Sequence, residues 1–216
     1  MTAKDFETGR VATLRGIVRK LCAEHDDRLP FHGWHHIAFV TAKGVEFARR
    51  NGSDTEIVAA AALVHDLNYL VRKNSEPSAG ESLRADQLRR SGFTHAEIDR
   101  IEAVITESHT ASRTCEISPE GAALSDADTL FKAVPITPVV LSHRYLAEND
   151  ISLGQLARKI VDEQAPLVEE GIYFYDPDAR DRYLPWATAN LDLWKSLLDS
   201  LDDPDVKELL RSVNVR

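Results

Sequence analysis

The chain lacks the features of exported and membrane proteins. Its two cysteines, Cys22 and Cys115, lie far apart and form no C-x-x-C spacing, so no disulfide framework is expected and a reducing compartment fits. The N-terminal residues 1–6 (MTAKDF) contain no apolar run that could serve as a signal peptide. No stretch approaches the ~18 uninterrupted apolar residues of a membrane span. We therefore expect a cytoplasmic protein.

Positive charge is scarce as well. The chain has 26 Lys and Arg against 35 Asp and Glu, which gives a formal net charge of −9. This balance argues against polymeric nucleic acid or an anionic membrane as the main partner, because both bind basic surfaces. A small phosphorylated substrate stays compatible, since a metal ion and a few basic side chains would hold it locally. We expect such a substrate, and a monomer or a homodimer.

Strand-like alternation of apolar and polar residues is also absent. Apolar residues instead recur at spacings of three and four, which is the helical period. We expect helices around the apolar faces of residues 11–21 and 37–47 and at 57–67, 79–91, 95–109, 119–132, 138–148, 153–169, 178–201 and 204–213. The sequence therefore predicts an all-α fold.

Helix starts carry recognisable signals. The capping-box pattern, Ser/Thr-x-x-Glu/Gln, occurs at 53–56, 78–81, 94–97 and 152–155. A proline follows a capping residue at positions 119, 138, 177 and 204. Loops are expected at 26–34, 68–77, 110–117 and 171–177. The last of these is aromatic, and we expect it to staple the C-terminal helices rather than to close over a pocket.

No repeat, low-complexity segment or Gly/Ser-rich linker divides the 216 residues. With 43% hydrophobic and 28% charged residues, the chain has the composition of a protein with a substantial core. We therefore expect one domain over residues 1–216, with a motif-bearing core at about 30–145 and the C-terminal helices 150–216 packed on it. Trp186 and Trp194 in the C-terminal part are expected to make core or dimer contacts.

The most informative stretch is the apolar run 59–64 (AAAALV), which leads directly into His65 and Asp66. Burying a carboxylate costs several kcal/mol or more unless it is paired or bound to a cation. An imidazole and a carboxylate are also the ordinary ligand pair for Zn²⁺, Mn²⁺, Fe or Ni. On the dipeptide alone, a surface His-Asp that merely terminates a helix stays an open alternative.

Other segments extend this pair into a longer pattern. A histidine-rich stretch precedes it at 32–40 (HGWHHIAFV), and His109 and the segment 126–130 (DADTL) follow it. In order and context these elements resemble the HD superfamily of metal-dependent phosphohydrolases. The small stand-alone bacterial members are most similar, because they have Lys-Asn after the HD pair, as at 73–74. The resemblance covers roughly residues 30–145 and implies a helical bundle that carries H…HD…D ligands.

The resemblance implies four ligands for one divalent transition metal (Mn, Fe, Ni, Co or Zn): His36, His65, Asp66 and Asp128. The family's His-x-x-x-Val spacing selects His36 over His35, and neighbouring helical residues point about 100° apart, so only one of them can face a metal. The family's Ala-Asp-x-Leu pattern selects Asp128, with Asp126 as the alternative. Such a ligand set leaves positions open for water and substrate.

Several residues beside these motifs are candidates for binding substrate or assisting catalysis. His109 would hydrogen-bond a phosphate or the attacking water, ligate a second metal, or simply cap its helix. Arg72 and Lys73 follow the HD pair and would hold a phosphate beside Asp66, unless they are solvated loop charges. His32 lies in a loop from which it would contact substrate.

Two departures from the family pattern leave roles open. Glu76 stands where the two-metal branch has its first extra histidine, so one metal is expected, with a weak second site at Glu76 and His109 as an alternative. Tyr69 stands where some members have a glutamate base. The general acid or base is therefore left open among Glu76, Glu81 and Glu107.

The resemblance implies a hydrolase that cleaves a phosphoester or phosphoanhydride bond, for example of a nucleotide, by attack of metal-activated water. Asp66, His109, Lys73 and Arg72 are its candidate catalytic residues. Two alternatives of other classes stay open. One is a hydratase or a di-iron oxygenase acting on a small molecule on the same scaffold, and the other is a non-catalytic module that binds a metal or a nucleotide.

Overall fold

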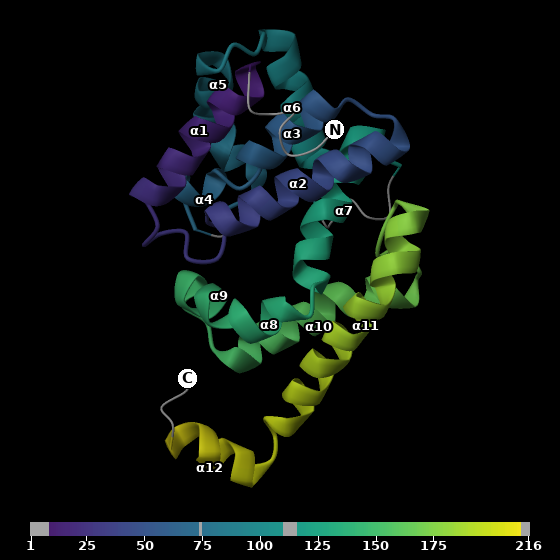
Figure 1. The fold of residues 1–216 in the computed structure, drawn as a ribbon. Helices are drawn as coiled ribbons and strands as arrows, with labels where there is room; N and C mark the ends of the chain where they lie inside the picture. The colour runs from purple at the N-terminus through teal and green to yellow at the C-terminus, as the bar shows by residue number, and fades with distance from the viewer. Residues whose placement is uncertain (1–8, 74, 110–115, 213–216) are drawn as a thin grey trace.

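The computed structural model describes residues 9–73, 75–109 and 116–212. Throughout these ranges the chain is helical between its turns and loops, with no strand, so the predicted all-α fold is confirmed. In chain order (Figure 1) the elements are α1 (Gly9–Glu24), α2 (Trp34–Asn51), α3 (Thr55–Val64), α4 (Asn68–Val71), the 3-10 helix η2 (Pro77–Gly80), α5 (Glu81–Arg90), α6 (His95–Ser108), α7 (Pro119–Ala133), α8 (Ile136–Val140), α9 (Ser142–Asn149), α10 (Leu153–Glu169), α11 (Pro177–Ser200) and α12 (Pro204–Ser212).

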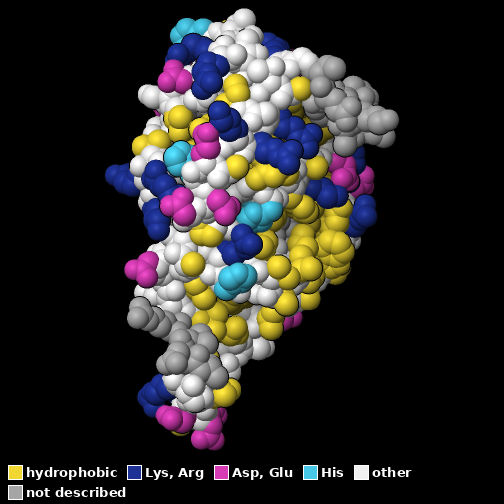
Figure 2. Space-filling view, turned by 60° about the vertical axis from the view of Figure 1, so that its left-hand side comes forward, with side chains coloured by type: hydrophobic (Ala, Val, Ile, Leu, Met, Phe, Trp, Pro, Cys, Tyr) yellow, Lys and Arg dark blue, Asp and Glu magenta, His cyan; other side chains and the backbone are white. Residues whose placement is uncertain are grey.

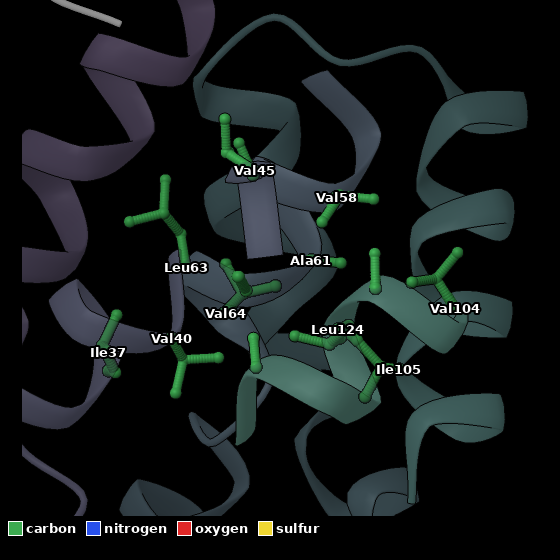
Figure 3. Close-up of a cluster of buried hydrophobic side chains, with 14 of the residues drawn as sticks. Ile37, Val40, Val45, Val58, Ala61, Leu63, Val64, Val104, Ile105 and Leu124 are labelled. Atoms are coloured by element: carbon green, nitrogen blue, oxygen red, sulfur yellow. The ribbon is translucent and has the colours of Figure 1, made fainter. Parts of the chain in front are cut away.

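Helix α3 is the centre of the main core. Every side chain from Ile57 to Val64 is buried, because α1, α2, α6 and α7 pack around this helix. The small side chains of the four alanines 59–62 let the neighbouring helices pack close to α3. A helix that is apolar on all sides is stable only when other elements enclose it. Figure 3 shows apolar side chains of α2, α6 and α7 gathered around those of α3. This arrangement fixes the end of α3, and with it the His-Asp pair, inside the bundle.

Most helix starts agree with the local signals, and three do not. The capping boxes at Thr94 and Ser152 are confirmed. The box predicted at 53–56 is wrong, because Asp54 caps α3 instead, and the box at 78–81 is wrong, because no side chain caps α5. The start predicted at 137–138 is wrong as well, because α8 begins at Ile136. The predicted helix 138–148 is split into α8 and α9 at Leu141, where φ is −116°.

The C-terminal helices pack on one another and on the main core. Helix α11 packs against both α10 and α7, and a small second apolar cluster forms around Leu156 and Trp194. The segment 171–177 staples these helices, as predicted: Tyr173 is fully buried and its hydroxyl donates to Gln164 on α10. The prediction that 1–216 forms a single domain stays a prediction.

Hydrophobic side chains reach the surface in several places. On the face drawn in Figure 2 they form a continuous area. Among the described residues of the whole molecule, the most exposed large hydrophobic side chain is that of Val139 on α8. Helix α12 has no buried residue at all. Among the described helices, none combines the length and the apolar composition needed to cross a bilayer.

Candidate metal centre and adjoining cavity

Three helices bring the predicted ligands together. His36 lies in the first turn of α2 and is buried, His65 is the C-terminal cap of α3, and Asp66 follows it in the turn to α4. Asp128 lies on α7. Because α2 packs against both α3 and α7, the first turn of α2, the end of α3 and the C-terminal half of α7 meet inside the bundle.

The potential ligand atoms are close enough to share one ion. His36 Nε2 lies 3.1 Å from His65 Nε2, 2.9 Å from Asp66 Oδ2 and 3.5 Å from Asp128 Oδ1, and His65 Nε2 lies 3.1 Å from Asp66 Oδ2. Ligands that sit about 2.0–2.2 Å from a metal are roughly 3 Å from one another. His36, His65 and Asp66 therefore form a group that could hold a metal ion, and Asp128 adjoins it.

The hydrogen bond of His65 also fits a metal. His65 Nδ1 lies 2.9 Å from the backbone carbonyl oxygen of Ala62, which can only accept, so Nδ1 carries the proton and Nε2 presents its lone pair to the group. His36 Nδ1 is buried without a hydrogen-bond partner in the described part of the chain. Two imidazole nitrogens 3.1 Å apart need a proton or a cation between them. The donor set of two nitrogens and two carboxylates suits a divalent transition metal.

Burial and neighbouring charges shift the pKa values of the cluster. Burial lowers the pKa of His36. For His65, burial acts in the same direction, but the neighbouring Asp66 carboxylate outweighs it and raises the pKa to about 9. Burial also disfavours the charged form of Asp128, but Lys132 outweighs it and holds the pKa of that carboxyl at about 2.

The two aspartates of α7 have different partners. Asp128 places Oδ1 near His36, and its Oδ2 accepts from Lys132 Nζ at 2.8 Å. Asp126 is fully buried and accepts hydrogen bonds from the backbone N–H groups of Tyr175 and Asp176, at 2.9 and 2.7 Å. Asp126 therefore anchors the segment 171–177, whereas Asp128 faces the cluster. The ligand role of Asp128 stays a prediction.

His32 is held beside the cluster by a residue that the sequence did not reveal. Glu148 of α9 is buried, its carboxylate accepts from the backbone N–H groups of Phe31 and His32, and it pairs with His32 Nδ1. The His32 ring stacks on Tyr69 at 3.9 Å and lies 5.7 Å from the ring of His36. Burial would raise the pKa of Glu148, but the bond to His32 outweighs it and lowers that pKa.

A cavity of about 630 Å³ adjoins the cluster. Its described lining residues are Phe31, His32, Tyr69, Ser75, Glu76, His109, Lys132, Thr137, Pro138, Ser142, Tyr145, Asn149, Ile151, Leu156, Lys159, Ile160, Glu163, Gln164, Leu167, Asn190 and Trp194. The candidates His32, His109 and Glu76 thus share one cavity. Arg72 and Lys73 are exposed and do not line it, and residue 74 and residues 110–115 lie outside the described ranges.

Other candidates lie away from the cluster. His35 is exposed on α2, on a different side from His36, as the helical geometry predicts. Trp34 packs against the core. Glu107 accepts hydrogen bonds from Ser118 at the start of α7, which is a structural use of that carboxylate. Lys132 was missed by the sequence analysis, although its position four residues after Asp128 was a usable signal.

The fold and the cluster define an all-helical protein with a His/His/Asp group that could hold a metal ion. Among solved structures, the chain is similar to the crystal structure of Bacillus subtilis YpgQ in complex with ADP. The TM-score is 0.59 at 21% sequence identity, over 90% of this chain and 97% of that one. At this identity the similarity concerns the fold alone. No protein-family model and no curated protein match the sequence.

Proposed function

We infer that the protein is a metal-dependent hydrolase that cleaves a phosphoester or phosphoanhydride bond of a small phosphorylated substrate, with a nucleotide as the first candidate. The observation that carries the proposal is the convergence of His36, His65 and Asp66 on one point. A cavity lies next to this point, since it is lined by His32 and by Lys132, the partner of Asp128. The resemblance of the H…HD…D pattern to HD-superfamily hydrolases supports it. So does the fold similarity to YpgQ, whose crystal structure contains ADP.

Separate residues of the protein would hold the metal and stabilise the phosphoryl group. His36, His65, Asp66 and Asp128 would hold the divalent metal, which supplies a water of lowered pKa and polarises a phosphoryl oxygen when it is bound. Lys132 pairs with Asp128 at the cavity wall, and His109 lines the same cavity. Both would place positive charge or a donor next to the phosphoryl group.

His32 is a further candidate for contacting the phosphoryl group. Its Nδ1 is occupied by Glu148, so only Nε2 is available to a substrate in the cavity. Arg72 and Lys73 are exposed in the turn after α4 and would contribute only to the outer phosphates of a longer substrate. The described geometry gives them no closer role.

A hydratase on this scaffold would need a small apolar pocket. The cavity here is instead large and includes two lysines and two glutamates among its described lining residues, which suits a polar substrate. A di-iron oxygenase would need a second set of ligands, and within the described ranges His36, His65 and Asp66 are the group whose ligand atoms converge.

The test is metal content per chain on protein purified without added metal. We expect about one transition metal per chain, lost in His36→Ala and kept in His35→Ala, which removes the adjacent exposed histidine of the same helix. His109→Ala should keep the metal. A panel of phosphoesters and nucleotides with Mn²⁺, Co²⁺ or Ni²⁺ then measures turnover, which should vanish in Asp66→Ala.

Three outcomes would contradict the proposal. Equal metal content in the His36 and His35 variants would remove the ligand assignment. Two irons per chain, one of them lost in His109→Ala, would point to the oxygenase. Metal binding without turnover of any phosphoester or nucleotide would favour a non-catalytic module.

A further inference from the structure

The cavity is connected to the candidate metal centre at two places. Lys132 lines the cavity and pairs with Asp128 at 2.8 Å, and His32 lines the cavity with its ring 5.7 Å from that of His36. The other walls come largely from α9, α10 and α11, which lie outside the segment that carries the metal motifs. A substrate whose reacting phosphoryl group is at the cluster would therefore extend toward the C-terminal helices.

The charges in the cavity do not suit a chain of phosphates. Its described lining contains two lysines and two glutamates, and both lysines already have carboxylate partners. Lys132 pairs with Asp128, and Lys159 pairs with Glu163 at 2.9 Å. Glu76 and Glu163 would repel a polyphosphate in the cavity, whereas an uncharged group would leave both ion pairs as they are. The cavity therefore fits the uncharged part of a substrate, with the phosphates at the metal centre.

The remaining walls suit a planar ring. Aromatic side chains (Phe31, Tyr145 and Trp194) and aliphatic side chains (Leu156 and Ile160) line the cavity. A volume of about 630 Å³ lies within the ~300–1,000 Å³ of small-molecule sites, which are predominantly apolar and contain a few polar groups. Aromatic side chains also offer stacking surfaces to a base.

One buried amide in this wall lacks a partner. Asn190 of α11 lines the cavity and is 3% exposed, and its Nδ2 donates to the backbone carbonyl of Lys132 at 2.6 Å. Because a carbonyl can only accept, this bond fixes the amide orientation and leaves Oδ1 as the group without a partner among the described residues. Leaving a buried acceptor unpaired carries a free-energy cost. A ligand with an N–H or O–H donor would remove that cost.

We propose that this cavity is the subsite for the nucleoside part of a nucleotide substrate, seated between α9, α10 and α11, with Asn190 as a specificity-determining residue. The proposal rests on the proposed function for the position of the phosphates. A nucleoside combines the properties that the cavity calls for: it is uncharged, it has a planar ring, and its hydroxyls and base provide donors. The C-terminal helices then select the substrate, while α2, α3 and α7 hold the metal.

Binding of free nucleosides tests the subsite without any turnover. Adenosine, guanosine, cytidine and uridine are titrated separately into the full chain by calorimetry, and at least one should bind. Ile160→Trp fills the cavity from a half-buried position, and Asp162→Trp puts the same side chain on an exposed position of α10 outside the cavity. We expect the nucleoside affinity to fall at least tenfold in Ile160→Trp and to be unchanged in Asp162→Trp. Equal affinities in both variants, or no nucleoside binding to the unaltered chain, would overturn the proposal.

A second experiment tests Asn190 by comparing the affinities of related nucleosides for the same protein. A general loss of stability would lower all of these affinities together and would leave their ratios unchanged. If adenosine is the ligand, it is compared with purine riboside, 2′-deoxyadenosine and 3′-deoxyadenosine, each of which lacks one donor. The unaltered chain should prefer adenosine over at least one of them, and Asn190→Leu should abolish that preference. The same ratios in both proteins would remove Asn190 from the proposal.

The two proposals fail in different ways. If nucleoside binding is weakened by Ile160→Trp but the protein hydrolyses no phosphoester or nucleotide, the subsite proposal stands and the hydrolase proposal fails. If Ile160→Trp lowers kcat/KM equally for ATP and for inorganic pyrophosphate, the hydrolase proposal stands and the subsite proposal fails. If both proposals hold, kcat/KM falls at least tenfold more for ATP than for pyrophosphate.

Discussion

Replacing Glu148 with alanine should weaken the fold and release His32. The Glu148 carboxylate accepts from the backbone N–H groups of Phe31 and His32, at 2.7 and 3.1 Å, and pairs with the His32 ring. All of these contacts are buried. They tie the loop before α2 to α9, more than a hundred residues later in the sequence. Glu148 therefore joins the histidine-bearing helix to the C-terminal helices.

The expected loss follows from what Glu148→Ala leaves behind. Breaking a buried charged pair costs about 3–5 kcal/mol, since the surviving donors stay buried without an acceptor. Glu148→Gln should cost less, about 1–3 kcal/mol, because an amide oxygen still accepts from the backbone but carries no charge. Urea unfolding followed by circular dichroism measures both changes. Glu169→Ala, an exposed glutamate on α10, is the control and should change stability by less than about 0.5 kcal/mol.

The contribution of Glu148 should also depend on pH with a definite sign. The pKa of Glu148 is lowered in the folded protein, because the bond to His32 outweighs burial. A carboxyl of this kind stabilises the fold fully above its ordinary pKa of about 4.3, and loses that effect as the pH falls through the lowered value. The difference between the unaltered chain and Glu148→Gln should therefore be constant near neutral pH and shrink below about pH 4.3.

Two results would refute this account of Glu148. A loss of less than about 1 kcal/mol in Glu148→Ala would mean that water replaces the carboxylate at no cost, so the site is not closed. A difference between the unaltered chain and Glu148→Gln that grows on acidification would mean that the pKa of Glu148 is raised rather than lowered.

Four further predictions concern the two aspartates of α7, the packing of α3 and the capping box of α6. Asp126→Ala should lower the free energy of unfolding by about 2–4 kcal/mol by freeing two buried backbone donors, while keeping the metal. Asp128→Ala should lose the metal. A metal assay and urea unfolding check both variants, and loss of metal in Asp126→Ala but not in Asp128→Ala would contradict the roles given to the two aspartates. Ala61→Leu should cost about 1–3 kcal/mol by overpacking the fully buried α3, and an unchanged urea midpoint would contradict close packing there. Thr94→Ala should cost about 1 kcal/mol through its capping box, measured by thermal unfolding.

Much of the fold was readable in the sequence because its signals are local. The run 59–64 contains no polar side chain, so it could only be a buried helix, and α3 is buried throughout. The choice of His36 over His35 came from the His-x-x-x-Val spacing of the HD superfamily. The buried face of α2 agrees with that choice, because it contains His36, Ile37 and Val40.

The features that the sequence did not reveal depend on contacts between distant segments. Nothing near Glu148 indicates that its carboxylate reaches the loop before α2, because that contact exists only once α9 has packed beside it. The same holds for Asp126, whose partners lie in the segment 171–177. The break at Leu141 was missed because the apolar period continues through it.

The sequence by itself determined an all-α fold, the buried helix α3 and the order of the histidines and aspartates, since helical period and apolar content are properties of neighbouring residues. Only the tertiary structure decided which side chains face one another. It placed Asp128 beside His36 and bonded Asp126 to the segment 171–177. It also formed a cavity whose walls come largely from helices that carry no motif. The physical reason is that a site consists of distances across the fold, and those distances are fixed by how whole helices pack.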